Sequence, residues 1–471
     1  MLKILKKIYS SLKMNPIRLK LGHISALISP EIKFLHNVFT KNNYKLRIAG
    51  GAVRDIILDK NPDDIDFATD ALPQEMLQMC TKENIRVLNK NGLTHGTVTM
   101  RINDKANFEV TTLRIDRNPD GRHCEVEFTK DWLKDAERRD LTINALFIEL
   151  QHSENDEDTT GLLYDYFNGQ EDLKNKKIRF VNNPATRIEE DYLRIFRYFR
   201  FFARFTDFDS AHIHDPKVLE IISDRSENLS NISGERLWVE MKKILKYRTC
   251  VKVLPTMYEC GLLMQIGIVD KINNFDVYSE LDEKDFFFSD PDPLTVLAPI
   301  IKSTDVVQSM RSRMKISNFE LTLLEYLVMH RNLLSDLFEN ADSDKIIQHF
   351  QEFVILSTDS KRMITLSQEA IKLYSVSVNQ RNDLLHRWSL WKIPKFPTNG
   401  RKILEAWPNV RNRQLAPILN YLKQIWVQSD FNLTEDDLLN ESIYLEIVEK
   451  KIINIETSPE IKRKKINNNE D

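Results

Sequence analysis

The distribution of glycine divides this chain into two parts with different expected folds. Of the 12 glycines, eight lie before residue 170, and only Gly234, Gly261, Gly267 and Gly400 follow. Because glycine is common in tight turns and destabilises helix interiors, a long stretch with few glycines favours helices joined by short loops. We therefore expect an α+β protein in which a small mixed β-sheet is followed by an all-α remainder.

The overall composition is that of an ordinary globular protein. The 471 residues are 42% hydrophobic and 29% charged, enough for two to four domains. No apolar run approaches the roughly 18 residues that a spanning helix needs, so we expect no membrane association. The formal net charge of −3 indicates no general affinity for nucleic acid, and a basic surface would have to be local. The four cysteines form no CxxC pair, which is typical of reduced, intracellular residues.

Residues 46–70, LRIAGGAVRDIILDKNPDDIDFATD, predict a strand, a Gly-Gly turn, a helix that begins near Val53, and a second strand. Strand side chains repeat every two residues, so Asp64 and Asp66 in the second strand would lie on one face. Two adjacent carboxylates repel each other unless a cation lies between them, and oxygen ligands suit Mg²⁺. We predict that Asp64 and Asp66 are catalytic Mg²⁺ ligands, although an isolated Asp-x-Asp is more often a solvated pair.

The Gly-Gly turn upstream of these aspartates predicts a phosphate site. Gly50 and Gly51 let the backbone approach an anion, and the following helix offers free N–H groups. Arg54, one turn further, can fork onto the same phosphate. The motif consists of Gly-Gly, then twelve residues, then Asp-x-Asp, and it resembles the polymerase-β nucleotidyltransferase superfamily. The fuller string GGAVRD…DIDFAT resembles the CCA-adding branch of that superfamily.

A third carboxylate follows in NFEVTTLR, which predicts a strand over residues 107–114. Glu109 is flanked there by apolar Phe108 and Val110. From a neighbouring strand, Glu109 would complete the catalytic carboxylate cluster. An exposed strand glutamate with no catalytic role is an alternative interpretation.

Residues 115–128, IDRNPDGRHCEVEF, combine Pro-Asp-Gly turn chemistry with charges and predict a mobile loop. The segment is similar to that of eukaryotic CCA-adding enzymes. In that family the region includes a flexible loop involved in the change from C to A addition. The resemblance implies this role for Asp116 and Arg122.

Residues 137–145, ERRDLTINA, predict the start of a helix. Arg138 and Arg139 are donors suited to a triphosphate, and Asp140 could accept a hydrogen bond from a ribose hydroxyl. Arg-Arg-Asp alone is a common surface sequence. RRDLTINA, however, resembles the second motif of the same family, which implies nucleotide binding by all three residues.

Residues 187–204, RIEEDYLRIFRYFRFFAR, predict one helix with a charged face and an aromatic face. Asp191 and Arg194 are three residues apart, and such a pair is usually a weak surface ion pair. Cytosine and adenine each present an amino donor beside a ring-nitrogen acceptor, whereas guanine and uracil present the reverse. A carboxylate beside a guanidinium would therefore accept C and A, because mispaired buried groups cost several kcal/mol.

The string EDYLRIFR resembles the base-selecting EDxxR motif of class II tRNA nucleotidyltransferases. The resemblance implies base selection by Asp191 and Arg194, with Glu190 orienting them, and nucleotide contacts from Arg197 and Arg200. A further segment, Ser-Gly-Glu-Arg at 233–236, resembles the family feature that begins a bracing helix. It implies a supporting role for Glu235 and Arg236, with Ser233 as the N-cap.

The resemblance is strongest over residues 46–240 and extends to about residue 430. It implies template-independent addition of CCA to the 3′ end of tRNA from CTP and ATP, with Mg²⁺ as cofactor and tRNA as partner. Three alternatives stay open: a poly(A) polymerase of the same superfamily, an enzyme that adds only CC or only A, and a non-catalytic tRNA-binding module. The stopping point and the use of CTP distinguish the polymerase from the CCA-adding enzyme.

The N-terminal residues 1–30 contain no acidic residue and place six basic residues among Leu and Ile. A basic amphipathic helix of this kind is typical of a mitochondrial import signal, with a basic surface helix as the alternative. We expect a mitochondrial matrix location, and also cytosol or nucleus, because Met14 is a second possible start and Lys462–Lys465 is a weak nuclear-import candidate. The predicted organisation is a targeting segment (1–30), a nucleotidyltransferase head (31–182), a neck (183–270), a helical body (271–395), a tRNA-binding tail (396–456) and a disordered end (457–471).

Overall fold

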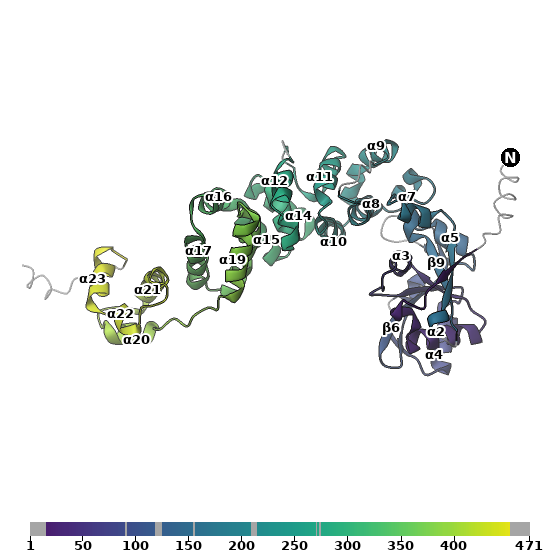
Figure 1. Cartoon of the computed structure of the whole chain (residues 1–471), viewed down its shortest axis with the longest axis horizontal. Helices are drawn as coiled ribbons and strands as arrows, with labels where there is room; N and C mark the ends of the chain where they lie inside the picture. The colour runs from purple at the N-terminus through teal and green to yellow at the C-terminus, as the bar shows by residue number, and fades with distance from the viewer. Residues whose placement is uncertain are drawn as a thin grey trace, which may run out of the picture. The chain divides into compact units, whose positions relative to one another are not determined.

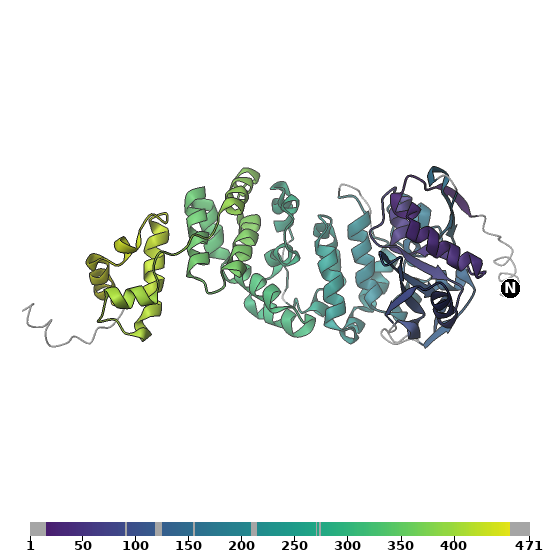
Figure 2. The same cartoon turned by 90° about the horizontal axis from the view of Figure 1, so that it is seen from below.

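The computed structural model describes residues 16–89, 92–117, 125–153, 156–208, 214–269, 271–272 and 275–452. The chain, drawn in Figures 1 and 2, divides into two compact units. Unit 1 comprises Met1–Lys271 with Gln308–Ile316, and unit 2 comprises Ile272–Val307 with Ser317–Asp471. Every described strand lies in unit 1, and unit 2 is helical. The predicted α+β fold class is therefore confirmed.

Unit 1 begins with an eight-stranded mixed sheet. Its strand order is β1 (Ile17–Lys20), β10 (Thr160–Asp165), β9 (Leu146–Gln151), β2 (Leu46–Ala49), β3 (Asp66–Thr69), β6 (Ala106–Thr112), β5 (Thr97–Ile102) and β4 (Arg86–Asn89). The β3–β6 pair is parallel and the other described pairs are antiparallel. A separate hairpin pairs β7 (Arg114–Arg117) with β8 (Glu125–Phe128). The prediction of a loop over residues 115–128 is therefore wrong at both ends of that segment, and its centre lies outside the described residues.

The two faces of the sheet bury different clusters because strand side chains alternate. Ile48 and Phe67 face the larger core, which includes residues of α2 (Pro30–Lys41), α3 (Gly51–Ile57) and α4 (Pro73–Lys82). The adjacent Ala49 and Ala68 face a smaller core with Trp132 and Ala136 of α5 (Trp132–Glu137). Strands β2 and β3 are thus covered on both faces, and α3 packs in the larger core.

The boundary of the predicted targeting segment at residue 30 lies inside this fold. Residues 17–20 form β1, which pairs with residues 160–163 at the edge of the sheet. Leu21 and Leu27 are buried in the larger core. A strand of four residues carries too little periodic pattern to be predicted, and the basic residues around it dominated the interpretation. Met14 lies outside the described residues, as do Lys462–Lys465.

Helices complete unit 1. They are α6 (Gly169–Lys174), α7 (Pro184–Glu190), α8 (Leu193–Phe205), α9 (Pro216–Asp224), α10 (Gly234–Leu245) and α11 (Cys250–Glu259). The end of α14 (Thr304–Met314) also belongs to unit 1. The prediction of one helix over residues 187–204 is wrong, because α7 ends at Glu190 and Asp191 is extended, with φ −157°. The carboxylate of Asp191 accepts a hydrogen bond from the backbone N–H of Leu193 at 3.1 Å. This local bond favours a new helix start over continuation.

Unit 2 consists of packed helices, several of which Figure 1 labels. They are α12 (Val277–Glu283), α13 (Pro293–Leu297), the start of α14, α15 (Asn318–Met329), α16 (Arg331–Asn340), α17 (Ser343–Leu356), α18 (Ser360–Tyr374), α19 (Val378–Leu390), α20 (Gly400–Ala406), α21 (Leu415–Gln428), α22 (Glu435–Leu438) and α23 (Glu441–Glu449). The last four share a core centred on Trp407, Leu422 and Trp426, which Ile355 of α17 joins. Among the helices described, none is long and apolar enough to cross a lipid bilayer.

Candidate active site

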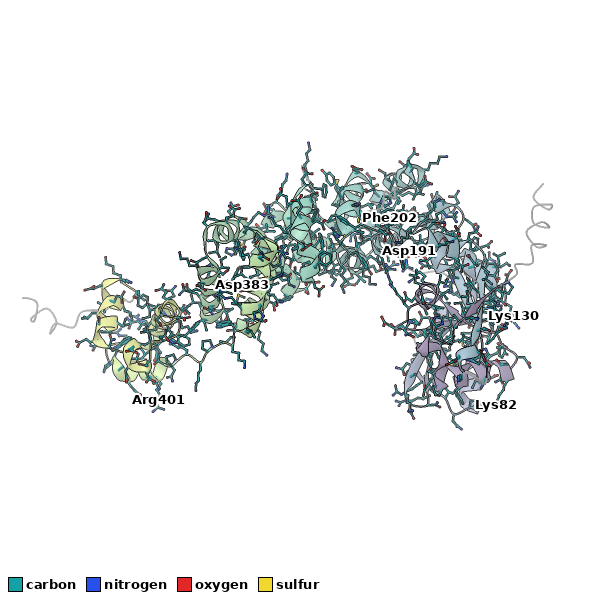
Figure 3. All side chains as sticks on the ribbon, viewed as in Figure 1. Lys82, Lys130, Asp191, Phe202, Asp383 and Arg401 are labelled. Atoms are coloured by element: carbon teal, nitrogen blue, oxygen red, sulfur yellow. The ribbon has the colours of Figure 1, made fainter. Side chains whose placement is uncertain are left out.

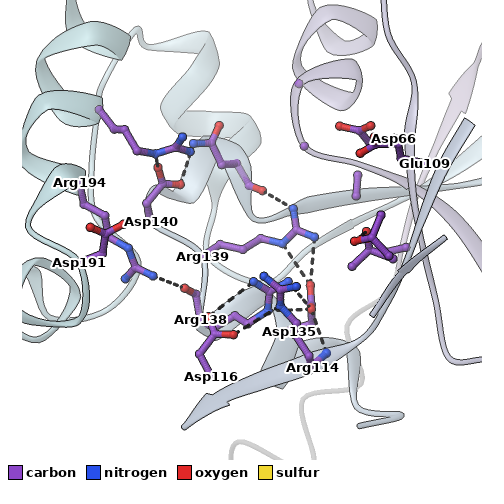
Figure 4. Close-up of a pocket in the computed structure, with 18 of the residues that line it drawn as sticks. Asp66, Glu109, Arg114, Asp116, Asp135, Arg138, Arg139, Asp140, Asp191 and Arg194 are labelled. Carbon is purple, nitrogen blue, oxygen red and sulfur yellow. Dashed lines mark hydrogen bonds and ion pairs between the residues drawn. The ribbon is translucent and has the colours of Figure 1, made fainter. Parts of the chain in front are cut away.

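A cavity of about 640 Å³ in unit 1 collects most of the residues that the sequence singled out (Figure 4). Its size falls in the range of small-molecule sites. Thirteen of the predicted residues line it: Gly51, Arg54, Asp66, Glu109, Asp116, Arg138, Arg139, Asp140, Asp191, Arg194, Arg197, Arg200 and Arg236. Eight arginines and six acidic residues are among the lining residues, so the cavity suits an anionic ligand. Asp64, Glu190 and Glu235 are not lining residues, and Arg122 lies outside the described part of the chain.

Two carboxylates lie side by side on one wall of the cavity. The parallel pairing of Phe67 with Val110 sets Asp66 at the start of β3 beside Glu109 of β6, and Figure 4 shows the two together. Burial raises the pKa of Asp66, and the charges of Glu109 and Asp64 raise it further. The prediction that Asp64 shares the strand is wrong. β3 begins at Asp66, and Asp64 lies in the bend before it.

The carboxylates on this wall fit a metal ion that takes its other ligands from a bound substrate. Within the described residues, no group of three or more His, Cys, Asp or Glu side chains is arranged to hold a metal ion. Mg²⁺, however, is usually bound by one or two carboxylates together with water and substrate phosphates. Asp66 and Glu109, with the charge of Asp64 nearby, match that smaller requirement. Their mutual repulsion, visible in the raised pKa of Asp66, is the feature that a cation would relieve.

The Gly-Gly turn leads into α3, as the sequence predicts. Gly50 has φ +72°, in the region that favours glycine. A Cβ at Gly51 would lie 3.2 Å from Nη2 of Arg54, so glycine leaves room for that guanidinium. Arg54 is buried, donates to Oδ1 of Asn144 and lies 4.8 Å from the ring centre of Phe201. Burial and the nearby Arg204 lower the pKa of Arg54 to about 10, so it stays charged at neutral pH.

The Arg-Arg-Asp segment follows a helix and does not begin one. The prediction of a helix start at residues 137–145 is wrong, because α5 ends at Glu137 and only a short 3₁₀ turn, Thr142–Asn144, comes after it. Arg138 and Arg139 lie just past the C-terminus of α5 and both donate to Asp135 of that helix. The backbone leaves the helix here, and Arg139 also donates to the carbonyl of Asn144 at 3.1 Å.

Asp140 is buried and accepts three hydrogen bonds. Oδ1 accepts from the N–H of Leu141 and from Nδ2 of Asn144, and Oδ2 accepts from Nε of Arg197 at 2.6 Å. Burial alone would raise the pKa of Asp140, but Arg197 and these hydrogen bonds outweigh it and hold the pKa well below its ordinary value. The ionised Asp140 therefore ties α8 to the segment that carries Arg138 and Arg139.

Asp191 and Arg194 both line the cavity but bind different partners. Oδ2 of Asp191 accepts from Nη2 of Arg236 at 2.9 Å. Arg194 donates to Glu190 at 2.6 Å and to the carbonyl of Arg138 at 2.8 Å. In Figure 4, Asp191 and Arg194 lie on the opposite side of the cavity from Asp66 and Glu109. The cavity thus separates a polar recognition pair from a carboxylate pair.

The remaining predicted residues surround this pair. Arg200 bonds to buried Glu240 of α10 at 2.9 Å. Glu235 pairs with Lys315 at 3.1 Å, outside the cavity lining. Ser233 occupies the N-cap position of α10, but its side chain makes no capping bond. On the hairpin, Asp116 pairs with Arg114 at 3.4 Å and with Arg138 at 3.7 Å.

Sequence reasoning missed Asp135, Arg114 and Asn144, which also line the cavity. Asp135 precedes Arg138 and Arg139 by three and four residues, the spacing that places helix side chains together, and this signal was available. Asn144 lies within the TINA part of the predicted motif. No pattern marks Arg114, because two of its partners, Asp135 and the carbonyl of His95, come from segments distant in sequence.

Comparisons with known proteins place this site in context. Two family models match: the poly A polymerase head domain over residues 46–179 and the probable RNA and SrmB-binding site of polymerase A over residues 214–266. The mitochondrial CCA tRNA nucleotidyltransferase 1 of Danio rerio is 40% identical over 90% of this chain and 93% of that protein. Its Homo sapiens counterpart is 40% identical over 90% of this chain and 92% of that protein. The structure of the Bacillus stearothermophilus CCA-adding enzyme in complex with CTP shares the fold, with TM-score 0.67 and 20% identity over 90% of this chain and 100% of that chain.

Proposed function

This chain belongs to the CCA tRNA nucleotidyltransferase family, and from that premise we infer that it adds C, C and A to the 3′ end of tRNA, using CTP and ATP. The observation that carries this inference is the 40% identity to full-length relatives over 90% of the chain. In each step the tRNA 3′ oxygen forms a bond to the α-phosphorus of the nucleotide. The bond from that phosphorus to the bridging oxygen of the β-phosphate breaks, and pyrophosphate leaves.

Base selection is assigned to Asp191 and Arg194. A carboxylate offers about four acceptor sites and a guanidinium five N–H donors, so both retain capacity after binding Arg236 and Glu190. An acceptor beside a donor matches the edges of cytosine and adenine. Arg236 orients Asp191 and Glu190 orients Arg194, so the pair is positioned before a base binds, and we propose this orienting role for Glu190.

The triphosphate is assigned to the arginine-rich centre of the cavity. Arg138 and Arg139 lie between the carboxylate pair and the recognition pair in Figure 4. Gly51 and Arg54 would bind from the adjacent wall, and Arg197 and Arg200 from α8. Guanidinium groups fork onto phosphate oxygens, which gives both affinity and orientation. The ribose contact proposed for Asp140 would use its one remaining acceptor site.

A divalent metal is expected of polymerase-β-type nucleotidyltransferases, and we assign Mg²⁺ to Asp66, Glu109 and Asp64. Mg²⁺ bound there with the triphosphate would lower the pKa of the tRNA 3′-hydroxyl and stabilise the departing pyrophosphate. Asp66 and Glu109 would orient that end of the nucleotide. The arginines on the facing wall would hold the rest of the triphosphate in line with the attacking oxygen.

We propose a mitochondrial location, which is supported by relatives that are named as mitochondrial enzymes. We assign the basic N-terminal residues to import into the mitochondrial matrix, and we keep cytosol and nucleus as further proposed locations.

We assign tRNA binding to the tail helices α20–α23. Arg401 on α20, labelled in Figure 3, has an exposed side chain that forms an ion pair with Glu405 of its own helix, and it could reach a phosphate.

The test uses purified protein, Mg²⁺ and tRNA that ends at the discriminator base, with labelled CTP, ATP, GTP and UTP offered singly and together. Growth by three nucleotides that needs both CTP and ATP is the expected result. A long ladder from ATP alone would indicate a poly(A) polymerase. Growth by C only, or by A only on tRNA ending in CC, would indicate partial addition. Tight tRNA binding without incorporation would indicate a binding module.

A further inference from the structure

Asp135 lies at the centre of the arginine cluster and is almost completely buried, with an exposed fraction of 1%. Oδ1 accepts from Nε and Nη2 of Arg138 at 2.9 and 2.8 Å, and from the backbone N–H of Arg114 at 3.2 Å. Oδ2 accepts from Nε and Nη2 of Arg139 at 3.2 and 3.0 Å. One carboxylate therefore binds both arginines and the first residue of the β7–β8 hairpin, as Figure 4 shows.

These five hydrogen bonds occupy the acceptor capacity of the Asp135 carboxylate, which is about four lone-pair sites. The side chain has nothing left for a metal ion or a substrate hydroxyl. Asp135 is therefore not a further metal ligand or a general base, although it lines the same cavity.

The same bonds fix the orientation of each arginine. A guanidinium carries five N–H groups, and Asp135 uses the Nε–Nη2 edge of both Arg138 and Arg139. Arg139 gives one more N–H to the carbonyl of Asn144 and packs 4.7 Å from the ring centre of Phe147. The two guanidiniums are thus locked in orientation by the edge that each presents to Asp135.

The cluster also contacts the recognition side of the cavity. The backbone carbonyl of Arg138 accepts from Nη2 of Arg194 at 2.8 Å, and its guanidinium lies 3.7 Å from Asp116 of the hairpin. Burial by itself would raise the pKa of Asp135, but Arg138 and Arg139 outweigh burial and keep the pKa below its ordinary value. Asp135 is therefore ionised at neutral pH and balances two positive charges.

We propose that Asp135 is a positioning residue for nucleotidyl transfer, which aims the guanidiniums of Arg138 and Arg139 at the triphosphate without touching the substrate. The proposal rests on the proposed function, in which these arginines bind the triphosphate. A misdirected guanidinium loses the phosphate contact even though its charge remains, so removing the Asp135 charge should weaken every ligand that carries the β- and γ-phosphates.

The experiment compares Asp135→Asn with wild type. KM and kcat are measured for CTP on tRNA that lacks CCA and for ATP on tRNA that ends in CC, and pyrophosphate is titrated as an inhibitor. The expected result is a parallel rise of roughly ten- to hundredfold in both nucleotide KM values and in the inhibition constant of pyrophosphate. The KM for tRNA should not change.

Two controls separate the possible outcomes. Asp131→Asn, at the N-cap of the same helix, retains the capping oxygen and should leave all constants at wild-type values. Arg139→Ala tests the premise: unchanged nucleotide and pyrophosphate constants in that variant would overturn the proposed triphosphate site itself. If Arg139→Ala weakens both ligands but Asp135→Asn lowers only the fraction of active enzyme, with unchanged constants, the positioning role of Asp135 is overturned.

If Asp135→Asn does not fold, the same constants are measured for Asp135→Glu. This variant keeps the negative charge but shifts it by one methylene group. Raised nucleotide KM values and a raised pyrophosphate constant in this variant would support positioning. Wild-type values for both would overturn it, because the guanidiniums would then tolerate a displaced partner.

Discussion

Asp191 accepts a hydrogen bond from Arg236 at 2.9 Å, although 45 positions separate the two residues in the chain. Arg236 belongs to α10, whereas Asp191 lies in the break between α7 and α8. The orientation of the predicted base-selecting carboxylate therefore depends on how α10 packs against α8. Arg194, its predicted neighbour in recognition, is held from the other side by Glu190.

Arg236→Ala should reduce base selectivity. Without Arg236, Asp191 can rotate, and the preference for CTP and ATP over UTP and GTP should fall about tenfold, or about 1.4 kcal/mol. Single-nucleotide incorporation with each of the four triphosphates measures the change. Arg225→Ala is the matched control, because Arg225 pairs with Glu189 of α7 at 2.7 Å and neither residue lines the cavity. Equal loss of selectivity in both variants would contradict the role of Arg236.

Asp66→Asn should stop incorporation and leave tRNA binding intact. Loss of this ligand removes several kcal/mol of charge stabilisation, so kcat should fall about a thousandfold or more. Chelation with EDTA should stop the wild-type enzyme, and added Mg²⁺ should restore it but not the variant. The neighbouring Asp63→Asn, at an exposed residue outside the cavity lining, is the control. Near wild-type turnover by Asp66→Asn would show that the metal is held elsewhere.

Gly234→Ala should destabilise unit 1 by about 1–3 kcal/mol, the cost of overpacking. A Cβ there would lie 1.9 Å from the carbonyl oxygen of Arg313, so the end of α14 would have to move. Gly400, which also begins a helix, would meet only the flexible side chain of Leu415 at 3.2 Å. Chemical denaturation should therefore show a large loss for Gly234→Ala and little change for Gly400→Ala. Equal losses would indicate a helix-start effect unrelated to the α14 contact.

The stability of unit 1 should fall as the pH drops from about 6.5 to about 4. Burial lowers the pKa of His214 to about 4, and its Nδ1 lies 2.9 Å from the hydroxyl of Tyr198. The unfolded chain binds the proton in this range and the folded protein does not, so stability is full above about pH 6.5 and decreases below it, by up to about 3 kcal/mol.

Urea denaturation across this pH range measures the slope. His214→Gln should flatten it, whereas His95→Gln, which replaces an exposed histidine of the same unit, controls for the loss of a histidine. An unchanged slope in His214→Gln would assign the effect to other groups.

If the N-terminal residues are removed on import, as proposed, the processed protein should begin before residue 17. Processing after residue 30 would remove β1 and the buried side chains of Leu21 and Leu27 from the core. Mass spectrometry of the N-terminal peptide identifies the processing site. Deletion of residues 1–15 should preserve thermal stability, and deletion of residues 1–28 should lower it. A stable, active form that starts near residue 30 would show that β1 is dispensable.

The sequence by itself determined the chemistry of this protein to a large extent. Glycine distribution predicted the α+β part and the helical remainder, and short motifs predicted thirteen residues that line one cavity. Local motifs are readable because turns, caps and phosphate-binding loops depend on neighbouring residues. Asp66 and Glu109 were found because each lies on a recognisable strand, and pairing of those strands brings them together.

Tertiary structure alone decided how the side chains are held. The bond from Arg236 to Asp191 and the pairing of the short edge strand β1 depend on packing between distant segments. The spacing of Asp135 to the two arginines is a sequence signal, but its burial and its bond from the backbone N–H of Arg114 come from packing against the hairpin. Burial makes unpaired charges costly, so each buried charge takes the partner that folding brings within reach. Those partners are a property of the packed chain, which residue type and spacing do not encode.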